Sequence, residues 1–182
     1  MYEAPDSSLM RRVREGDLGS LALLFERHHR SLFNYFVHLN GNRDLSEDLV
    51  QDVFFRMLKY RQTYQPDKSF TAWMYQIARN AQTDTSRKRR FEVELGDTDY
   101  GSVHPIDERL TRDQQVALLR RAIGRLPVDK RELLILSRYQ NLKYEDIASI
   151  LGVDVGTVKV RVYRAVRALG QIFFELAGEK TA

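Results

Sequence analysis

The side chains best suited to chemistry in this 182-residue sequence are basic and polar ones spaced along a predicted helix near the C-terminus. Between Val155 and Leu169 the chain has four basic residues and no acidic residue. Arginine can bind both guanine edges and phosphates, so a positive helix of this kind suits the major groove of DNA. The DNA contacts predicted on this helix are Thr157, Lys159, Val160, Arg161, Tyr163, Arg164 and Arg167.

The residues before this helix predict the turn that would present it. Gly152 stands where the chain must reverse sharply, and glycine adopts the positive φ that other residues resist. Asp154 is then a predicted N-cap of the following helix, and the small Ala148 would let two helices cross closely. These features predict a helix-turn-helix. The alternative is an ordinary helical hairpin with a solvated basic face. The apolar positions of the pair are Ile147, Ala148, Leu151, Val153, Val158 and Val162.

A second candidate site lies on the predicted helix that begins near Ser69. Asn80 and Asp84 are one turn apart, and a side-chain amide and a carboxylate can both bind the edge of an extruded base. The basic residues nearby would bind phosphates, which gives affinity rather than sequence choice. For Lys88 alone, a solvated helix end is the simpler interpretation. These basic residues are Arg79, Arg87, Lys88, Arg89 and Arg90.

Aromatic residues in and before the same helix offer surface on which an unstacked base could stack. Stacking on an aromatic ring contributes about 1–3 kcal/mol per base and tolerates any sequence. The candidates are Tyr64, Phe70, Trp73 and Tyr75. Trp73, at helical spacing with Phe70 and Ile77, also fits a core position, and this alternative stays open.

The sequence offers little for catalysis or metal binding. It has no cysteine, which excludes disulfides and thiolate sites and fits a reducing, cytoplasmic location. Its four histidines, at positions 28, 29, 38 and 104, show no metal-ligand spacing. We find no nucleophile with a partnering base, so we predict no catalytic residue, no metal, no cofactor and no enzyme. The start of the chain lacks the apolar core of a secretory signal, and no apolar run approaches the roughly 18 residues of a membrane helix.

Long segments of 3.6-residue periodicity predict an all-α protein of two small helical domains. The first domain, residues 1–90, should contain helices over 8–14, 18–39, 45–60 and 69–90. Residues 91–108 carry six acidic residues and no lysine or arginine, which predicts an acidic, flexible linker over residues 91–109. The second domain, residues 110–182, should contain helices over 110–126 and 128–139 and then the helix-turn-helix, whose last helix could extend through Phe174.

Two separated segments resemble one protein family. Residues 141–169, NLKYEDIASILGVDVGTVKVRVYRAVRAL, resemble the promoter-reading region 4 of bacterial sigma factors. DLSEDLVQDVFFRML and FTAWMYQIARNAQTDTSRKRR resemble their region 2. The order of these segments, the Leu126-Pro127 pair and the absence of a third domain are similar to the small extracytoplasmic-function (group 4) type. The chain differs from the usual pattern at Lys143, at Val160 and at Asp154-Val155, so the resemblance implies no particular promoter sequence.

The resemblance implies a transcription initiation factor whose partners are core RNA polymerase and promoter DNA, with an anti-sigma factor as a candidate regulator. The helix-turn-helix residues would bind the minus-thirty-five element, and Tyr64, Trp73, Tyr75 and the polar residues from Arg79 to Arg90 would bind the melted minus-ten strand. The acidic linker would thread toward the active centre of the polymerase. The polymerase partners implied are the β′ clamp helices and the β flap. The residues implied to dock on the clamp helices are Asp48, Leu49, Gln51, Asp52, Phe55 and Arg56.

Two other functions remain open from the sequence. An autonomous helix-turn-helix regulator would bind duplex DNA without polymerase, although such regulators usually dimerise on palindromes and no separate dimerisation domain is evident. A nucleic-acid enzyme such as a recombinase would use the helix-turn-helix only as an anchor. It would need a nucleophile and acid–base partners that the sequence does not offer.

Overall fold

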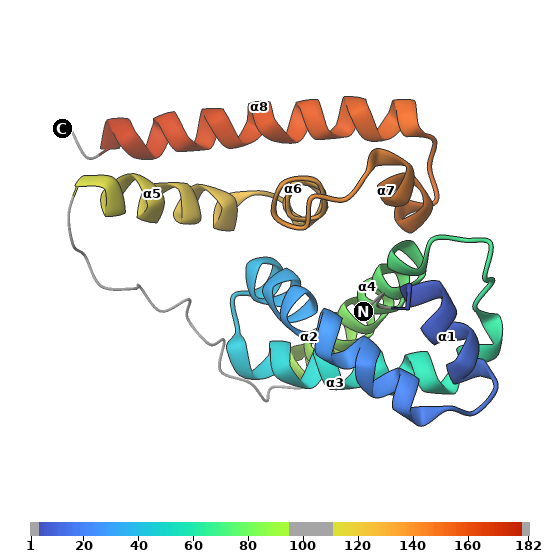
Figure 1. Ribbon diagram of the computed structural model, residues 1–182. Helices are drawn as coiled ribbons and strands as arrows, with labels where there is room; N and C mark the ends of the chain where they lie inside the picture. The colour runs from blue at the N-terminus through green and yellow to red at the C-terminus, as the bar shows by residue number, and fades with distance from the viewer. Residues whose placement is uncertain (1–3, 95–110, 180–182) are drawn as a thin grey trace. The chain divides into compact units, whose positions relative to one another are not determined.

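The computed structural model describes residues 4–94 and 111–179. Every regular element within these ranges is helical, which confirms the predicted all-α class. The elements fall into two compact units: α1 to α4 belong to the first, and α5, α6, η2, α8 and most of α7 to the second. Figure 1 labels the helices along the chain.

The first unit is built on two long helices and the helices packed against them. It contains α1 (Asp6–Arg14), α2 (Leu18–Asn40), α3 (Arg43–Lys59), the 3₁₀ turn η1 (Arg61–Thr63) and α4 (Phe70–Glu94). Helix α2 packs on α1 and α3, and α3 packs on α4. The apolar stripes predicted for these helices form one core. Among its fully buried side chains are Leu24, Leu32, Phe36, Val53, Met57 and Met74.

The turn between α2 and α3 forms as its composition predicts. Gly41 ends α2 in the left-handed conformation, with φ of 73°. Asn42 then caps α3, its side-chain oxygen accepting a hydrogen bond from the backbone amide of Leu45 at 2.9 Å. Such caps satisfy amides that the first helical turn leaves without partners. The sequence Asn40-Gly41-Asn42 therefore fixes both the end of one helix and the start of the next.

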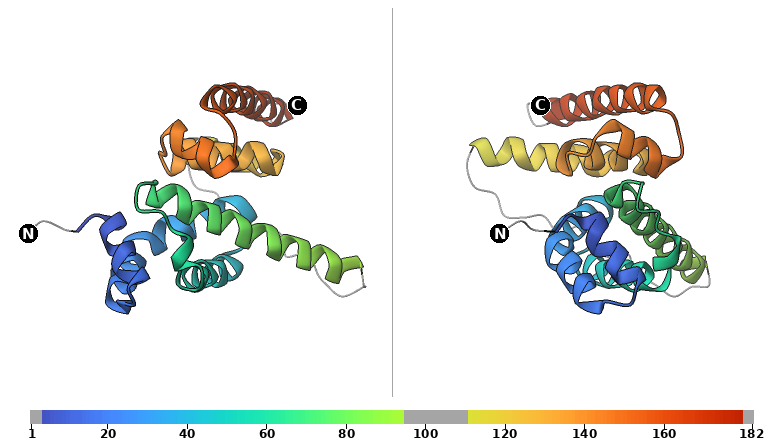
Figure 2. Two further views of the ribbon diagram at one scale, coloured as in Figure 1. Left: turned by 90° about the vertical axis from the view of Figure 1, so that its right-hand side faces the viewer. Right: turned by 45° about the vertical axis from the view of Figure 1, so that its right-hand side comes forward.

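Helix α4 is longer than predicted, and the predicted start of the acidic linker is wrong. Residues 91–94, assigned to the linker from their acidic composition, continue the helix to Glu94. This FEVE segment contains neither glycine nor proline, and the first helix-breaking residue is Gly96. Figure 2 (left) shows this end of α4 extending beyond α2 and α3. The rest of the predicted linker lies outside the described residues.

The second unit contains α5 (Thr111–Arg125), α6 (Val128–Leu134), the π-helical turn η2 (Ile135–Tyr139), α7 (Tyr144–Leu151) and α8 (Val155–Glu179). Helix α8 lies alongside α5, as Figure 1 shows. It continues to Glu179 because its C-terminal half packs on α5, where Leu176 meets Leu118 and Ala122. The predicted single helix over 128–139 instead ends in the π-helical turn. Within the described ranges, no helix is long and apolar enough to cross a membrane.

Candidate nucleic-acid and protein interfaces

The helix-turn-helix forms where the sequence predicts it. Helix α7 ends at Leu151, and Gly152 follows with a positive φ of 66°. Ile147 and Ala148 of α7 are buried, as are Val158 and Val162 of α8. Four of the predicted apolar positions are thus buried, Leu151 and Val153 are half-buried, and the polar side of α8 is at the surface.

Asp154 caps α8 as predicted. Its carboxylate accepts hydrogen bonds from the backbone amide of Thr157 at 2.7 Å and from the Thr157 hydroxyl at 2.6 Å. These hydrogen bonds hold the pKa of Asp154 below its ordinary value. Gly156 leaves room for this capping carboxylate, because a Cβ at position 156 would lie only 3.0 Å from Asp154 Oδ1. Residues 154–157 therefore set the entry of α8 by purely local interactions.

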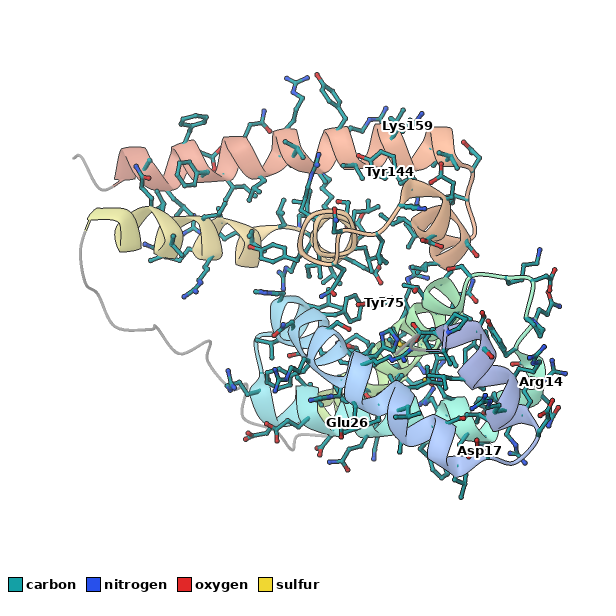
Figure 3. All side chains as sticks on the ribbon, in the orientation of Figure 1. Arg14, Asp17, Glu26, Tyr75, Tyr144 and Lys159 are labelled. Atoms are coloured by element: carbon teal, nitrogen blue, oxygen red, sulfur yellow. The ribbon has the colours of Figure 1, made fainter. Side chains whose placement is uncertain are left out.

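The predicted contacts on α8 divide between two parts of its surface. A shallow groove at the start of the helix is lined by Asp154, Gly156, Thr157, Val160, Arg161 and Arg164. Lys159, Tyr163 and Arg167 are exposed outside that groove (Figure 3 labels Lys159), and the Arg167 guanidinium lies 6.0 Å from the centre of the Tyr163 ring. The groove combines arginine donors with the Thr157 and Val160 side chains, so it can both hydrogen-bond to bases and contact a thymine methyl group.

The outer face of α3 carries most of the predicted protein contacts. Asp48 and Gln51 are exposed, and the Phe55 side chain is 66% exposed, an unusual position for a phenylalanine. Leu49 was predicted to belong to this face, and that prediction is wrong. Its side chain is buried in the core. Leu49 follows Asp48 directly, and consecutive side chains of an α-helix point in directions about 100° apart.

A groove beside this face was missed from the sequence. It runs between α2 and α3 and is lined by Phe25, His29, Arg30, Phe33, Asn34, Arg43, Glu47, Val50 and Gln51. The Phe25 and His29 rings stack with centroids 5.0 Å apart, and the Arg43 guanidinium lies 5.1 Å from the centre of the Phe33 ring. Phe25 and Phe33 fit the apolar periodicity of α2, so the sequence alone does not separate them from its core positions. Only the packing of α3 against α2 shows that both rings line this groove.

The aromatic residues predicted to stack on a base are mostly core residues. The Tyr64 and Tyr75 side chains are only 1% and 2% exposed, and Phe70 is also buried. Burial raises the pKa of Tyr75 to about 12; Figure 3 labels this residue on α4. The prediction that Tyr64 and Tyr75 offer stacking surface is therefore wrong, since a base could reach them only if the core opened. Trp73 is half-buried, with its ring centroid 5.2 Å from that of Tyr64, so part of its indole stays accessible.

The polar residues predicted on α4 are at the surface, with one important difference. Asn80, Arg79, Arg87 and Lys88 are exposed. The side chains of Arg89 and Arg90 lie outside the described residues. Asp84 was predicted to read a base, yet it accepts hydrogen bonds from two arginines.

Those two arginines belong to an ion-pair network that joins α3 to α4. Arg56 donates from Nε to Asp52 at 2.9 Å and from a terminal nitrogen to Asp84 at 2.8 Å. Arg87 contacts the other Asp84 oxygen at 3.2 Å. Burial alone would lower the pKa of Arg56, but its hydrogen bonds to Asp84 and Asp52 and their negative charges outweigh that effect and raise it. Arg56 and Asp84 are 28 positions apart, so no local pattern could reveal the pair.

The histidines take structural positions where they are described. His28 Nε2 lies 2.8 Å from a carboxylate oxygen of Asp6, whose other oxygen accepts a hydrogen bond from Arg27 at 2.8 Å. These contacts attach α1 to α2. Among the described residues, no group of three or more histidine, aspartate or glutamate side chains could hold a metal ion.

Comparisons with known proteins match both halves of the chain. Residues 24–92 match the family model for sigma-70 region 2, and residues 108–169 match that for sigma-70 region 4. The chain is 38% identical over 144 residues to the ECF RNA polymerase sigma factor EcfG of Rhodopseudomonas palustris, covering 79% of this chain and 80% of that protein. It is 32% identical over 162 residues to the ECF sigma factor SigL of Mycobacterium tuberculosis, covering 84% of this chain and 88% of that one.

Solved structures agree with these matches. The sigma factor RpoE of Bartonella quintana, crystallised with the anti-sigma factor NepR, is similar with a TM-score of 0.68 and 28% identity, covering 83% of this chain and 94% of that chain. CnrH, solved with the cytosolic domain of CnrY, shares the fold with a TM-score of 0.73 at 21% identity, covering 93% of this chain and 97% of that chain.

A region 2 unit followed by a region 4 unit with a helix-turn-helix defines a bacterial sigma factor, the class of initiation factor that directs RNA polymerase to promoters. The chain belongs to the extracytoplasmic-function family of RNA polymerase sigma factors. The resemblance identified from its sequence is confirmed.

Proposed function

We propose that this sigma factor docks on core RNA polymerase through the outer face of α3, defined by Asp48, Gln51 and Phe55. The observation that carries the proposal is the exposed Phe55 ring beside acidic and amide side chains. Exposed aromatic residues are favoured anchors in protein interfaces, where a few residues supply most of the binding energy. The groove between α2 and α3 adjoins this face through Gln51. The expected partner there is the pair of β′ clamp helices, with the β flap as the partner of the second unit.

The groove at the start of α8 is the proposed site for the minus-thirty-five element. Arg161 and Arg164 line it together with Thr157 and Val160. Arginine binds guanine in a bidentate manner, and apolar side chains contact thymine methyl groups. Lys159 and Arg167, which lie outside the groove, would contact phosphates and position the helix.

The surface of α4 is the proposed site for the melted minus-ten strand. The accessible edge of Trp73 and the exposed Asn80 amide supply stacking and hydrogen bonding. Arg79, Arg87 and Lys88 are exposed on the same helix and would hold the strand by its phosphates. The buried Tyr64 and Tyr75 are not part of this proposal.

Three further properties follow from the proposed role. The chain would act in the cytoplasm, where the polymerase is, and would contribute no catalytic residue of its own. We assign the polymerase-binding domain to residues 1–94 and the helix-turn-helix domain to residues 110–182. A relative with 28% identity was crystallised with an anti-sigma factor, so an anti-sigma factor is the expected regulator of this chain as well.

Complex formation with polymerase tests the proposal. A bacterial core RNA polymerase mixed with the chain should elute from a sizing column as a stoichiometric complex. An autonomous regulator would instead bind duplex DNA alone and elute separately from the polymerase. Separate elution at micromolar concentrations would therefore contradict the proposed function.

A further inference from the structure

Four charged residues of alternating sign form a continuous chain from α3 to α4. They are Asp52 and Arg56 on α3, followed by Asp84 and Arg87 on α4. Every link is a direct contact of 3.2 Å or less between a guanidinium nitrogen and a carboxylate oxygen. Charge-assisted hydrogen bonds of this kind are stronger than neutral ones.

Arg56 is the least exposed of the four residues in this row of ion pairs, and it contacts both carboxylates. Its side chain is only 24% exposed, whereas that of Arg87, at the outer end, is 81% exposed. Two of the Arg56 nitrogens already donate to carboxylates of its own chain. This geometry leaves Arg56 poorly placed to contact the polymerase, which is the role that its position on α3 suggested.

The same contacts change the meaning of Asp84. One of its oxygens accepts from Arg56 and the other from Arg87, so reading a base would require the loss of an existing partner. Its negative charge is also unfavourable on a helix that must approach DNA phosphates, because like charges repel. The positive charge of Arg56, approaching from the neighbouring helix, compensates it.

We infer that Arg56 is a positioning residue for DNA capture: it fixes the Asp84 carboxylate and neutralises its charge, which would otherwise repel DNA phosphates at the surface of α4. This inference rests on the proposed function of α4. A residue of the polymerase-docking helix thereby acts on the DNA step without touching DNA. Asp52, on the far side of Arg56, steadies the guanidinium and is not itself required at the DNA surface.

Removing the charges of Arg56 and Asp84 in turn distinguishes charge compensation from a purely structural ion pair between α3 and α4. In a holoenzyme on a promoter selected for the wild-type protein, Arg56→Ala should leave core-polymerase affinity unchanged. It should reduce promoter opening by about fivefold, as expected for loss of a partly exposed ion pair. Adding Asp84→Asn to Arg56→Ala should restore opening, because the carboxylate left without compensation is then neutral. The control Glu26→Gln, which neutralises an exposed carboxylate of α2 outside both proposed interfaces, should open promoters as well as the wild type.

Permanganate footprinting of melted thymines measures opening, and fluorescence anisotropy measures polymerase affinity. Rescue by Asp84→Asn supports the inference. If the Arg56–Asp84 ion pair only held α3 and α4 together, replacing Asp84 as well as Arg56 would not restore opening. Weaker polymerase binding by Arg56→Ala would overturn it, as would normal opening by that variant or a double variant no better than the single one. A wild-type chain that fails to bind polymerase would instead overturn the proposed function, and this inference with it.

Discussion

Replacing Phe55 with alanine tests the polymerase-docking face most sharply. The Phe55 side chain is 66% exposed in the free protein. A phenylalanine can bury about 200 Å², so docking would cover at most roughly 130 Å² of this ring. At about 25 cal/mol per Å², that area corresponds to about 3 kcal/mol. Imperfect burial reduces this value, and we expect Phe55→Ala to weaken core-polymerase binding by about tenfold to a hundredfold.

The assay is a titration of labelled chain with core polymerase, followed by fluorescence anisotropy. Leu23→Ala is the matched control, because Leu23 is also an exposed apolar residue of the first unit but lies on α2, outside the docking face and its groove. Its affinity should equal that of the wild type. Circular dichroism should show equal helix content for all three proteins. If Phe55→Ala binds polymerase as tightly as Leu23→Ala, the docking face has been placed wrongly.

Three further predictions concern the two interfaces. Asp48→Arg should lower core-polymerase affinity in the same titration without changing helix content, since Asp48 is exposed on the docking face; unchanged affinity would remove this residue from the face. Arg161→Ala or Arg164→Ala should weaken upstream promoter recognition by about 1–3 kcal/mol in competition gel shifts with holoenzyme. The control Arg120→Ala on α5 should have no effect. If all three variants behave alike, the groove of α8 is not the minus-thirty-five site. Because the pKa of Asp154 is lowered in the folded protein, its contribution to stability is present above the ordinary aspartate value and is lost as pH falls through the folded value. Thermal melts of Asp154→Ala should therefore depend less on pH in the acidic range than melts of the wild type, and parallel curves would contradict this.

Local features of the fold could be predicted from the sequence because short-range rules decide them. The turn at Gly152 and the cap at Asp154 each depend on residues within a single turn of helix, and both form as predicted. The end of α2 at Gly41 follows the same logic. The π-helical turn after α6 was not predictable, since its residues also fit an ordinary helix.

The candidate sites were harder to predict, because exposure depends on where a neighbouring helix packs. Leu49, Tyr64 and Tyr75 belong to types found both in cores and in interfaces, and only the assembled unit shows that they are buried. The pairing of Arg56 with Asp84 links two helices that are separated by a turn, so helical spacing cannot reveal it. Such long-range contacts change the expected role of a residue without changing the fold.

Reconstituted transcription tests the central claim, that this chain directs RNA polymerase to promoters, most directly. Core polymerase, a library of bacterial genomic fragments and the purified chain should together yield discrete run-off transcripts. Their start sites should lie downstream of a shared pair of sequence elements. Neither the chain nor the core polymerase alone should produce them. If the chain binds duplex DNA by itself but adds no specific transcript to those of core polymerase, it does not act as a sigma factor and the central claim is wrong.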